Sequence, residues 1–461
     1  MKKLYITLIA LFLVASCDIL EFDDSINNSP NSPSEAAAQQ LLANAMMSLS
    51  GISSSTTGEF LGQYLSETQY VVASQYPSGG SSFYGWYQGP LINLESVLTG
   101  EFKTVTSENQ LAVAKILKAY YFWHLTDRWG DVPFTESLKG GENITPVYDT
   151  QQSIYNNLFA LLKEADAQID VAGTLPSDLI YSGDMSKWKK LGNTIRMLMA
   201  LRLSEIDAVK GKAEFNLAVA AGVMSSNSDS FAYNHLADAN NQNYWYGQIE
   251  VDGREWWALT KTLVDLMEPY SDPRLAVYGD PARTSGNYVG LPIGSAAAAA
   301  NTEAFSLLGT AIRAQDAPVY LVTYAQVLFA KAEAKELTWI TEDAETNYNA
   351  AIEQSFLQWT GSTAGLAAFM ADPDIAYDAA RAVEQIATQR YVHLFMHGYE
   401  AWAEWRRTGF PAFALSAGNA VPLRQSYTET ESFNNTENYN EAVQRQFGGT
   451  DGIYEAIWWD N

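Results

Sequence analysis

The longest apolar pattern in the chain covers residues 111–125, where apolar side chains surround most of a helix. Lys115 and Lys118 form a narrow polar strip along this helix. A helix that is apolar on nearly every side is buried by neighbours on several sides. The polar turn that follows should end this helix, because Gly130 permits positive φ and Pro133 favours extended geometry in the residue before it. We therefore expect a central buried helix with a defined exit turn.

Apolar residues at helical spacing recur along the rest of the chain. The predicted helices cover residues 34–49, 59–72, 83–98, 150–169, 185–206, 320–336, 343–356 and 376–405. Neighbouring helices such as 83–98 and the central helix should form antiparallel hairpins. Small and aromatic residues share one face of the helix at 343–356, which lets a partner helix approach closely. Paired alanine-rich helices of this kind resemble tetratricopeptide repeats.

The helical pattern stops after Ala221 and returns at Tyr320. We therefore predict an all-α fold in which tetratricopeptide-like helix pairs form one scaffold with a large irregular insertion at about residues 222–318. Nothing within residues 35–461 has the composition of a linker, so this range is predicted to be a single domain.

The N-terminal residues resemble an export signal. A basic Met-Lys-Lys start precedes an apolar run that is too short to span a bilayer, so residues 1–16 are predicted to be a signal peptide. Residues 14–17, Val-Ala-Ser-Cys, resemble the lipobox of bacterial lipoproteins, and Cys17 is the only cysteine. We predict that Cys17 carries a lipid anchor, which holds the chain to a membrane without a transmembrane helix. The alternative is a buried thiol in an uncleaved segment.

Residues 17–34 are acidic at first and then rich in Ser, Asn and Pro, which is typical of a flexible tether. Acidic residues just after a lipidated cysteine resemble the signal that exports lipoproteins to the cell surface in Bacteroidetes. The alternative is a solvated linker with no export role.

Composition narrows the range of partners. The chain carries 53 acidic and 28 basic residues, a net charge of -25, which should repel nucleic acid and anionic membrane surfaces. Aromatic residues make up 13% of the chain, and such residues either fill a core or grip ligands through flat faces.

Aromatic rings beside amides, in or next to irregular segments, are the candidate ligand contacts. The predicted contacts are Tyr76, Tyr84, Trp86, Asn243, Tyr244, Trp245, Tyr246, Arg254 and Trp257, with Trp256 between the last two. Sugars present flat C–H faces to rings and hydroxyls to amides and guanidinium groups, so such clusters suit them. The alternative is that these residues form the small core that an insertion needs.

Other clusters are weaker candidates for chemistry. His393 and His397 are spaced for one helix face, but Leu394 stands where a zinc protease has its catalytic Glu, so packing is the preferred interpretation. The charged clusters at residues 127–131 and 400–407 are predicted to be structural, because Arg stacks on rings and pairs with carboxylates. Phosphate, dinucleotide and serine-hydrolase motifs are missing from the sequence. No cofactor is predicted, and calcium binding among the many acids is left open.

Four stretches carry a resemblance to a known family. They cover residues 117–136, 272–275, 384–411 and 434–460, in an order and spacing that extend over nearly the whole mature chain. The chain resembles the SusD/RagB-type nutrient-binding lipoproteins of the bacterial outer membrane. Residues 421–425 depart from the family pattern, a change expected to affect only a peripheral loop.

The resemblance implies a fold and a function. It implies tetratricopeptide-like helix pairs, no catalysis, and a lipid-anchored lid on the cell surface over a SusC-type TonB-dependent transporter. The expected function is capture of a glycan, as in starch-binding relatives, and its delivery to that transporter. Two alternatives stay open: the same lid role with peptide or another small nutrient as cargo, and a surface glycosidase with a carboxylate pair.

Overall fold

The predicted central helix is α7, Glu108–Trp129, in a computed structural model that describes residues 37–100 and 106–460. Ser107 starts the helix through a capping box, which satisfies two backbone donors at once. Most side chains of α7 are buried, and Gly130 ends it with a φ of +85°. The predicted burial and exit turn are therefore confirmed.

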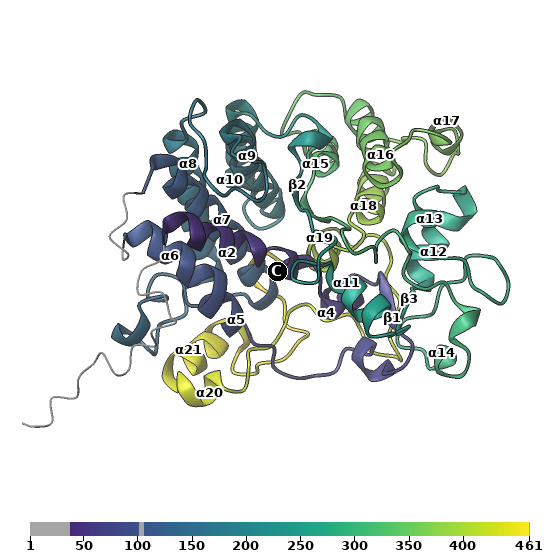
Figure 1. The fold of residues 1–461 in the computed structure, drawn as a ribbon, viewed down its shortest axis with the longest axis horizontal. Helices are drawn as coiled ribbons and strands as arrows, with labels where there is room; N and C mark the ends of the chain where they lie inside the picture. Colours follow the sequence, from purple (N-terminus) through teal and green to yellow (C-terminus); the bar gives the residue numbers. More distant parts are fainter. Residues whose placement is uncertain (1–36, 101–105, 461) are drawn as a thin grey trace, which may run out of the picture. The chain divides into compact units, whose positions relative to one another are not determined.

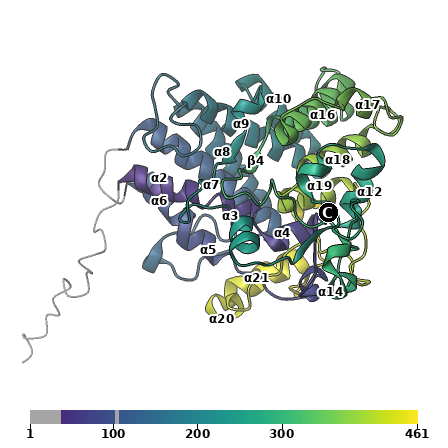
Figure 2. The same cartoon turned by 45° about the vertical axis from the view of Figure 1, so that its right-hand side comes forward.

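The scaffold consists of helix pairs. Its helices are α2 (Ala38–Met47), α6 (Ile92–Thr99), α7, α8 (Gln151–Gln168), α9 (Met185–Arg202), α10 (Ala208–Ala221), α15 (Tyr324–Glu336), α16 (Ala344–Thr360), α18 (Ala382–His393) and α19 (Gly398–Thr408). Helix α7 packs against α6 and α8, α9 against α8 and α10, and α15 against α16 and α18 (Figures 1 and 2). The all-α scaffold of helix pairs is as predicted, although α10 was not foreseen.

The predicted single helix over residues 376–405 is wrong, because the chain forms α18 and α19 with a break between them. The backbone at Gly398 lies against Gly58, so closely that a Cβ atom on Gly398 would come within 2.1 Å of the Gly58 carbonyl oxygen. The Glu59 carboxylate also accepts a hydrogen bond from the Gly398 N–H at 3.1 Å. Contact with a distant segment therefore sets the break.

The predicted helix over residues 59–72 is also wrong. Helix α4 (Thr56–Leu61) ends early, and strand β1 (Leu65–Glu67) and a 3₁₀ turn (Val71–Ser74) follow it. Strand β1 pairs antiparallel with β3 (Trp257–Leu259). Pairing with a remote strand thus outweighs local helical preference.

The irregular insertion contains only short elements, as predicted. Besides three 3₁₀ turns, they are β2 (Phe231–Tyr233), α11 (Tyr244–Tyr246), a π-helical turn (Gly247–Val251), β3, α12 (Lys261–Met267), α13 (Leu275–Tyr278) and α14 (Ala297–Ala300). Strand β2 pairs with β4 (Val319–Val322), just beyond the insertion.

A buried arginine ties the insertion to the scaffold. Arg274 pairs with Asp272 at 2.6 Å and is fully buried. Its guanidinium also donates to Ser355 of α16 and to Gln389 of α18, each at 2.9 Å. These bonds give the Asp-Pro-Arg-Leu stretch a structural role.

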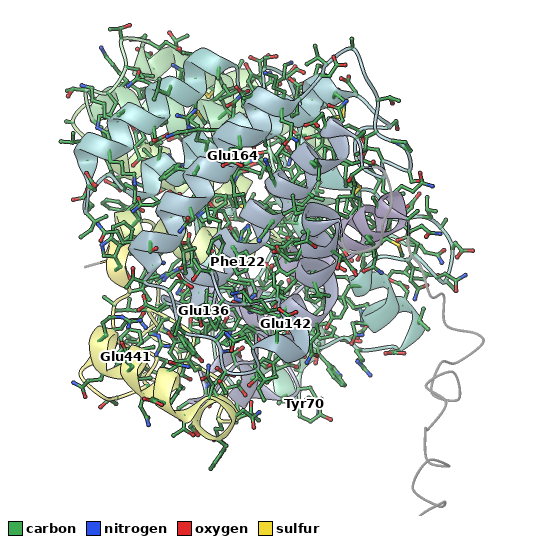
Figure 3. The ribbon with its side chains drawn as sticks, turned by 90° about the vertical axis from the view of Figure 1, so that its left-hand side faces the viewer. Tyr70, Phe122, Glu136, Glu142, Glu164 and Glu441 are labelled. Carbon is green, nitrogen blue, oxygen red and sulfur yellow. The ribbon has the colours of Figure 1, made fainter. Side chains whose placement is uncertain are left out.

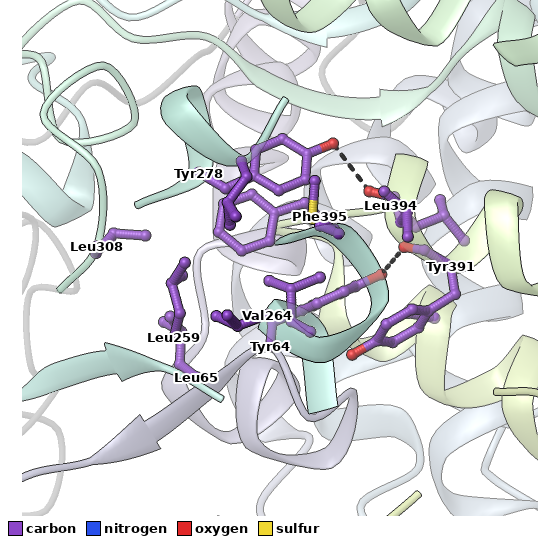
Figure 4. Packing of buried hydrophobic residues seen from close by; sticks show 14 of the residues in the cluster. Tyr64, Leu65, Leu259, Val264, Tyr278, Leu308, Tyr391, Leu394 and Phe395 are labelled. Carbon is purple, nitrogen blue, oxygen red and sulfur yellow. Dashed lines mark hydrogen bonds between the residues drawn. The ribbon is translucent and has the colours of Figure 1, made fainter. Parts of the chain in front are cut away.

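Stacked aromatic rings form the core where the insertion meets α18 (Figure 4). The rings of Tyr278 and Phe395 stack with centroids 4.1 Å apart. The Tyr64 hydroxyl donates to the Tyr391 carbonyl at 2.5 Å, and the Tyr278 hydroxyl donates to the Val392 carbonyl at 2.9 Å. Each buried hydroxyl therefore has a partner, and β1 is fixed against the scaffold.

The C-terminal segment closes over the end of α7. The Trp129 indole N–H donates to the carbonyls of Ser81 and Ser426, at 3.1 and 3.2 Å. Arg424 is fully buried and pairs with Asp451 at 2.6 Å. The expectation of a peripheral loop at 421–425 is therefore wrong, since Arg424 fixes the segment against the core.

Residues 38–461 form one compact unit. The predicted signal peptide, the tether and Cys17 lie outside the described residues, so they stay predictions. Within the described ranges, every helix is too short or too polar to cross a bilayer.

Candidate functional site

Two aromatic rings, exposed Tyr70 and half-buried Trp256, lie where the β1–β3 ladder ends. The Thr68 N–H donates to the Trp256 carbonyl at 2.7 Å, which brings the residues after β1 beside those before β3. The rings of Tyr70 and Trp256 meet edge to face with centroids 5.0 Å apart. Tyr70 is 60% exposed, and its ring projects from the ribbon in Figure 3. Strand pairing thus presents a ring pair to solvent.

A cation and a second tyrosine extend this surface. The Arg254 guanidinium lies 5.0 Å from the Trp256 ring centre and 3.2 Å from the Asp252 carboxylate. Its backbone N–H donates to the Gln248 carbonyl at 3.1 Å, and its side chain reaches the Gln248 amide oxygen. Tyr244, at the start of α11, is 37% exposed. We call Tyr70, Tyr244, Arg254 and Trp256 the aromatic shelf.

Buried rings support the shelf from below. Trp245 and Trp257 are both buried and meet edge to face at 5.2 Å. Tyr244 packs on Trp245 at 5.1 Å, and Trp256 on Trp257 at 5.8 Å. The rings of Tyr244 and Trp256 therefore have little freedom to lose when a ligand binds, which favours affinity.

The shelf combines flat apolar faces with polar groups at its edge. Partial burial raises the pKa of the Tyr244 hydroxyl, and the Arg254 charge opposes that rise, so the phenol stays protonated at neutral pH. Gln248 and Asp252 add amide and carboxylate oxygens beside Arg254. Such a surface can stack against a sugar ring and hydrogen-bond its hydroxyls.

The structure brings Tyr244 and Arg254 together on the shelf and places other predicted contacts beneath it or elsewhere. Asn243 is buried, where it caps α11 and donates to the Ala317 carbonyl at 3.1 Å. Trp245 and Trp257 are the supporting layer, so neither ring is open to solvent in this conformation. Tyr246 is half-buried in the same turn. Ligand contact by these residues stays a prediction.

Three further predicted contacts flank the Gly/Ser-rich residues 77–82 and pack against residues outside the shelf. Tyr76 is buried, and its hydroxyl accepts from the Gln63 amide at 3.1 Å. Trp86 packs against Tyr121 of α7, with ring centroids 5.7 Å apart. Tyr84 borders a separate groove.

Sequence reasoning missed Tyr70, and it grouped Trp256 with Trp257 without showing which of the two rings is accessible. Tyr70 was assigned to a helix, so its exposure after a strand was hidden. Trp256 was noticed between Arg254 and Trp257, but only alternation along β3 could show that Trp256 and Trp257 face opposite ways. That alternation is readable only once β3 is known to be a strand.

The two histidines of the considered zinc pattern do not share a helix face, because the break between α18 and α19 separates them. His393 contacts the Thr323 hydroxyl at 2.7 Å and the Ser355 hydroxyl at 3.0 Å, and burial lowers its pKa to about 3. His397 packs against His124, with ring centroids 5.4 Å apart. In the described ranges no group of three or more His, Cys, Asp or Glu side chains is arranged to hold a metal.

The predicted charged clusters form a buried ion network. Arg202 is fully buried and pairs with Asp127, Glu400 and Glu404 at 3.2, 2.9 and 2.5 Å. Burial raises the pKa of Glu400 to about 7, whereas the nearby Arg407, Arg390 and Arg202 outweigh burial and lower the pKa of Glu404. These contacts join α7, α9 and α19, so the clusters are structural, as predicted.

A hollow of about 570 Å³ between α12, α18 and residues 410–414 is another candidate. Its charged residues already pair with one another, Lys261 with Asp265 at 2.5 Å and Arg381 with Asp374 at 3.4 Å. The rings that line the hollow, Tyr270, Phe410 and Phe413, are half-buried, whereas Tyr70 on the shelf is 60% exposed, so we take the shelf as the better candidate for a ligand.

Comparison with known proteins places this geometry in context. The SusD-like family, described as starch-binding and associating with the outer membrane, matches residues 30–428. No curated protein gives a match.

Solved structures extend the similarity. A chitin-binding protein is 28% identical, with a TM-score of 0.82 over 92% of this chain and 100% of that one. A SusD homolog from Bacteroides fragilis is 27% identical, with a TM-score of 0.82 over 93% and 100%. A chitin-binding SusD homolog from Flavobacterium johnsoniae, 22% identical, shares the fold, with a TM-score of 0.80 over 92% and 98%.

Proposed function

The chain belongs to the SusD-like family of starch-binding proteins that associate with the outer membrane, and from this premise we propose that it captures an oligosaccharide on the aromatic shelf at the cell surface. In this proposal the bound sugar passes to a SusC-type TonB-dependent transporter, for which the protein acts as a lid. The chain binds its cargo and does not cleave it.

The observation that carries the proposal is the pair of rings formed by exposed Tyr70 and half-buried Trp256, of which Trp256 packs on the buried Trp257. Proteins with an open, pre-formed aromatic surface lose little entropy on binding a stiff, flat ligand. The shelf also has a cation, amides and a carboxylate for sugar hydroxyls. A relative that is 28% identical is chitin-binding, which favours a polysaccharide fragment over a peptide.

Calorimetry against soluble starch, chitin, xylan and mannan oligosaccharides tests the cargo. We expect saturable binding to one class, weakened at least tenfold by Trp256→Ala, since about 1.4 kcal/mol of lost stacking is tenfold in affinity. Tyr454→Ala removes an exposed aromatic ring outside the shelf and should leave affinity unchanged. Binding to peptides alone would transfer the lid role to peptide cargo, and release of shorter sugars would indicate a glycosidase.

The anchor and the transporter need separate tests. Cells that express the protein should incorporate labelled fatty acid into it, and Cys17→Ala should abolish the label. A TonB-dependent transporter encoded beside the gene should copurify with the detergent-solubilised protein. If the wild-type protein is soluble, carries no fatty-acid label and does not copurify with the transporter, this part of the proposal is contradicted.

A further inference from the structure

A groove of about 570 Å³ lies beside the turn that begins at α5 (Tyr84–Trp86). One wall is the helical segment that contains Tyr84, Tyr87 and Gln88, and the others are residues 133–146 and α20 (Glu431–Asn434). We call this hollow the α5 groove. None of its lining residues belongs to the aromatic shelf.

The α5 groove repeats the local backbone of the shelf. In the shelf, the three-residue α11 turn leads directly into a π-helical turn, Gly247–Val251. In the groove, the three-residue α5 turn leads into another π-helical turn, Tyr87–Leu91. Turns of this kind are rare in proteins, and those that occur often lie at functional sites.

The two turns also share side chains. A tyrosine opens each α turn, Tyr84 in the groove and Tyr244 in the shelf. A glutamine occupies the second position of each π turn, Gln88 in the groove and Gln248 in the shelf. The same pairing of ring and amide therefore occurs twice in the chain.

The tyrosines of the groove are fixed in place. Phe83 is buried between them, with ring centroids 5.5 Å from Tyr84 and 5.4 Å from Tyr87. The Tyr87 hydroxyl donates to the Pro133 carbonyl at 2.6 Å, and the Tyr84 hydroxyl donates to the Glu431 carboxylate. Because their hydroxyls are occupied, the partly exposed rings can offer a ligand their faces.

The groove has no free charge but does have a free amide. Among its described lining residues Glu431 is the one charged side chain, and its two oxygens accept from the hydroxyls of Tyr84 and Tyr148. Gln88 is exposed, and its side chain makes no hydrogen bond to any residue in the described part of the chain. A neutral ligand with hydroxyl groups fits this surface better than an ion or a charged peptide.

We propose that the α5 groove is a second binding site for a neutral saccharide, with Tyr84 and Tyr87 as the stacking surface and Gln88 as the hydrogen-bonding group. The class of ligand rests on the proposed function, whereas the site does not, since it shares no residue with the shelf. With two sites, the protein could hold one oligosaccharide at two places or bind two oligosaccharides at once.

The test is calorimetry with maltohexaose and chitohexaose on Trp256→Ala protein, in which the shelf is weakened. We expect a remaining binding isotherm that Gln88→Ala weakens about fivefold or more, the loss of a hydrogen bond of about 1 kcal/mol. Gln152→Ala, at an exposed position of α8, is the matched control and should change nothing. Tyr84→Phe, which keeps the ring, should retain binding.

Each other outcome is decisive. If the wild type binds and Trp256→Ala removes all binding, the shelf is the sole site and the second-site proposal is overturned. If binding survives Trp256→Ala but ignores Gln88→Ala, the groove is again excluded. If Gln88→Ala alone removes wild-type binding, the groove stands and the shelf proposal fails. If the wild type binds neither sugar, both proposals fail for these glycans.

Discussion

Two arginine–tryptophan pairs in this protein look alike in sequence and differ in use. Arg128 lies 4.3 Å from the Trp129 ring centre, is buried, and donates to the Gln425 side chain at 2.6 Å. Arg254 lies 5.0 Å from the Trp256 ring centre at the surface. One pair is enclosed by the C-terminal segment, and the other is open on one side.

The difference shows that burial and the number of partners within the protein distinguish a structural arginine from one that can contact a ligand. Around Arg128 the guanidinium also stacks on the Tyr399 ring at 3.8 Å and donates to its hydroxyl at 3.0 Å. Two rings contact the Arg128 guanidinium and two of its nitrogens donate within the protein, so this buried group holds elements together and is not open to a ligand. Arg254 and Trp256 keep an exposed face, which a ligand can cover.

The largest expected effect is in the scaffold, from Arg202→Met. Removing the cation leaves Asp127 and Glu400 buried without their ion-pair partner, although Glu404 keeps Arg390 and Arg407, and this should lower the free energy of unfolding by about 3–5 kcal/mol. Urea denaturation measures the loss. The control Arg254→Met should change the free energy of unfolding by less than about 0.5 kcal/mol. Equal losses of stability in the two variants would contradict the assignment of Arg202 to the scaffold and Arg254 to the shelf.

Trp129→Ala should cost nearly as much, about 3–5 kcal/mol, because the ring is fully buried and fills the space at the end of α7. The folded fraction should bind glycan with wild-type affinity, as calorimetry below the melting transition can show. Loss of affinity with an unaltered melting temperature would mean that this turn belongs to the site.

Acid should weaken the scaffold through His393. Burial lowers its pKa to about 3 in the folded protein, against about 6.5 when unfolded, so below about pH 6.5 only the unfolded chain takes up this proton. Relative to His393→Gln, the wild type should lose about 1.4 kcal/mol of stability per pH unit on acidification from about pH 6 to about pH 4. Parallel pH profiles of the two proteins would contradict this.

The smallest effect on stability is expected from Tyr70→Ala. The residue is exposed, so the free energy of unfolding should change by less than about 0.5 kcal/mol. Its ring supports one edge of Trp256, so glycan affinity should fall about threefold to tenfold. Tyr454→Ala is the matched control, and equal affinities for both variants would exclude Tyr70 from the shelf.

The part of the fold that follows from local chemistry was predictable. Helix α7 was visible because its apolar pattern is long, and its end was visible because Gly130 tolerates the φ of +85° that the exit requires. The insertion was visible because periodicity stops. The helix break at Gly398 was not predictable, because close contact with Gly58 causes it. The residues around Gly398 in the sequence give no sign of that contact.

The candidate site divides in the same way. The sequence alone determined that aromatic rings and amides gather in an irregular region, since residue type and loss of periodicity are local properties. Only the tertiary structure decided which rings face solvent. Pairing of β1 with β3 turns Trp256 outward and Trp257 inward and carries Tyr70 to the same edge. Exposure depends on which distant segments cover a side chain, so it is fixed by the assembled fold and not by the residue's neighbours in the chain.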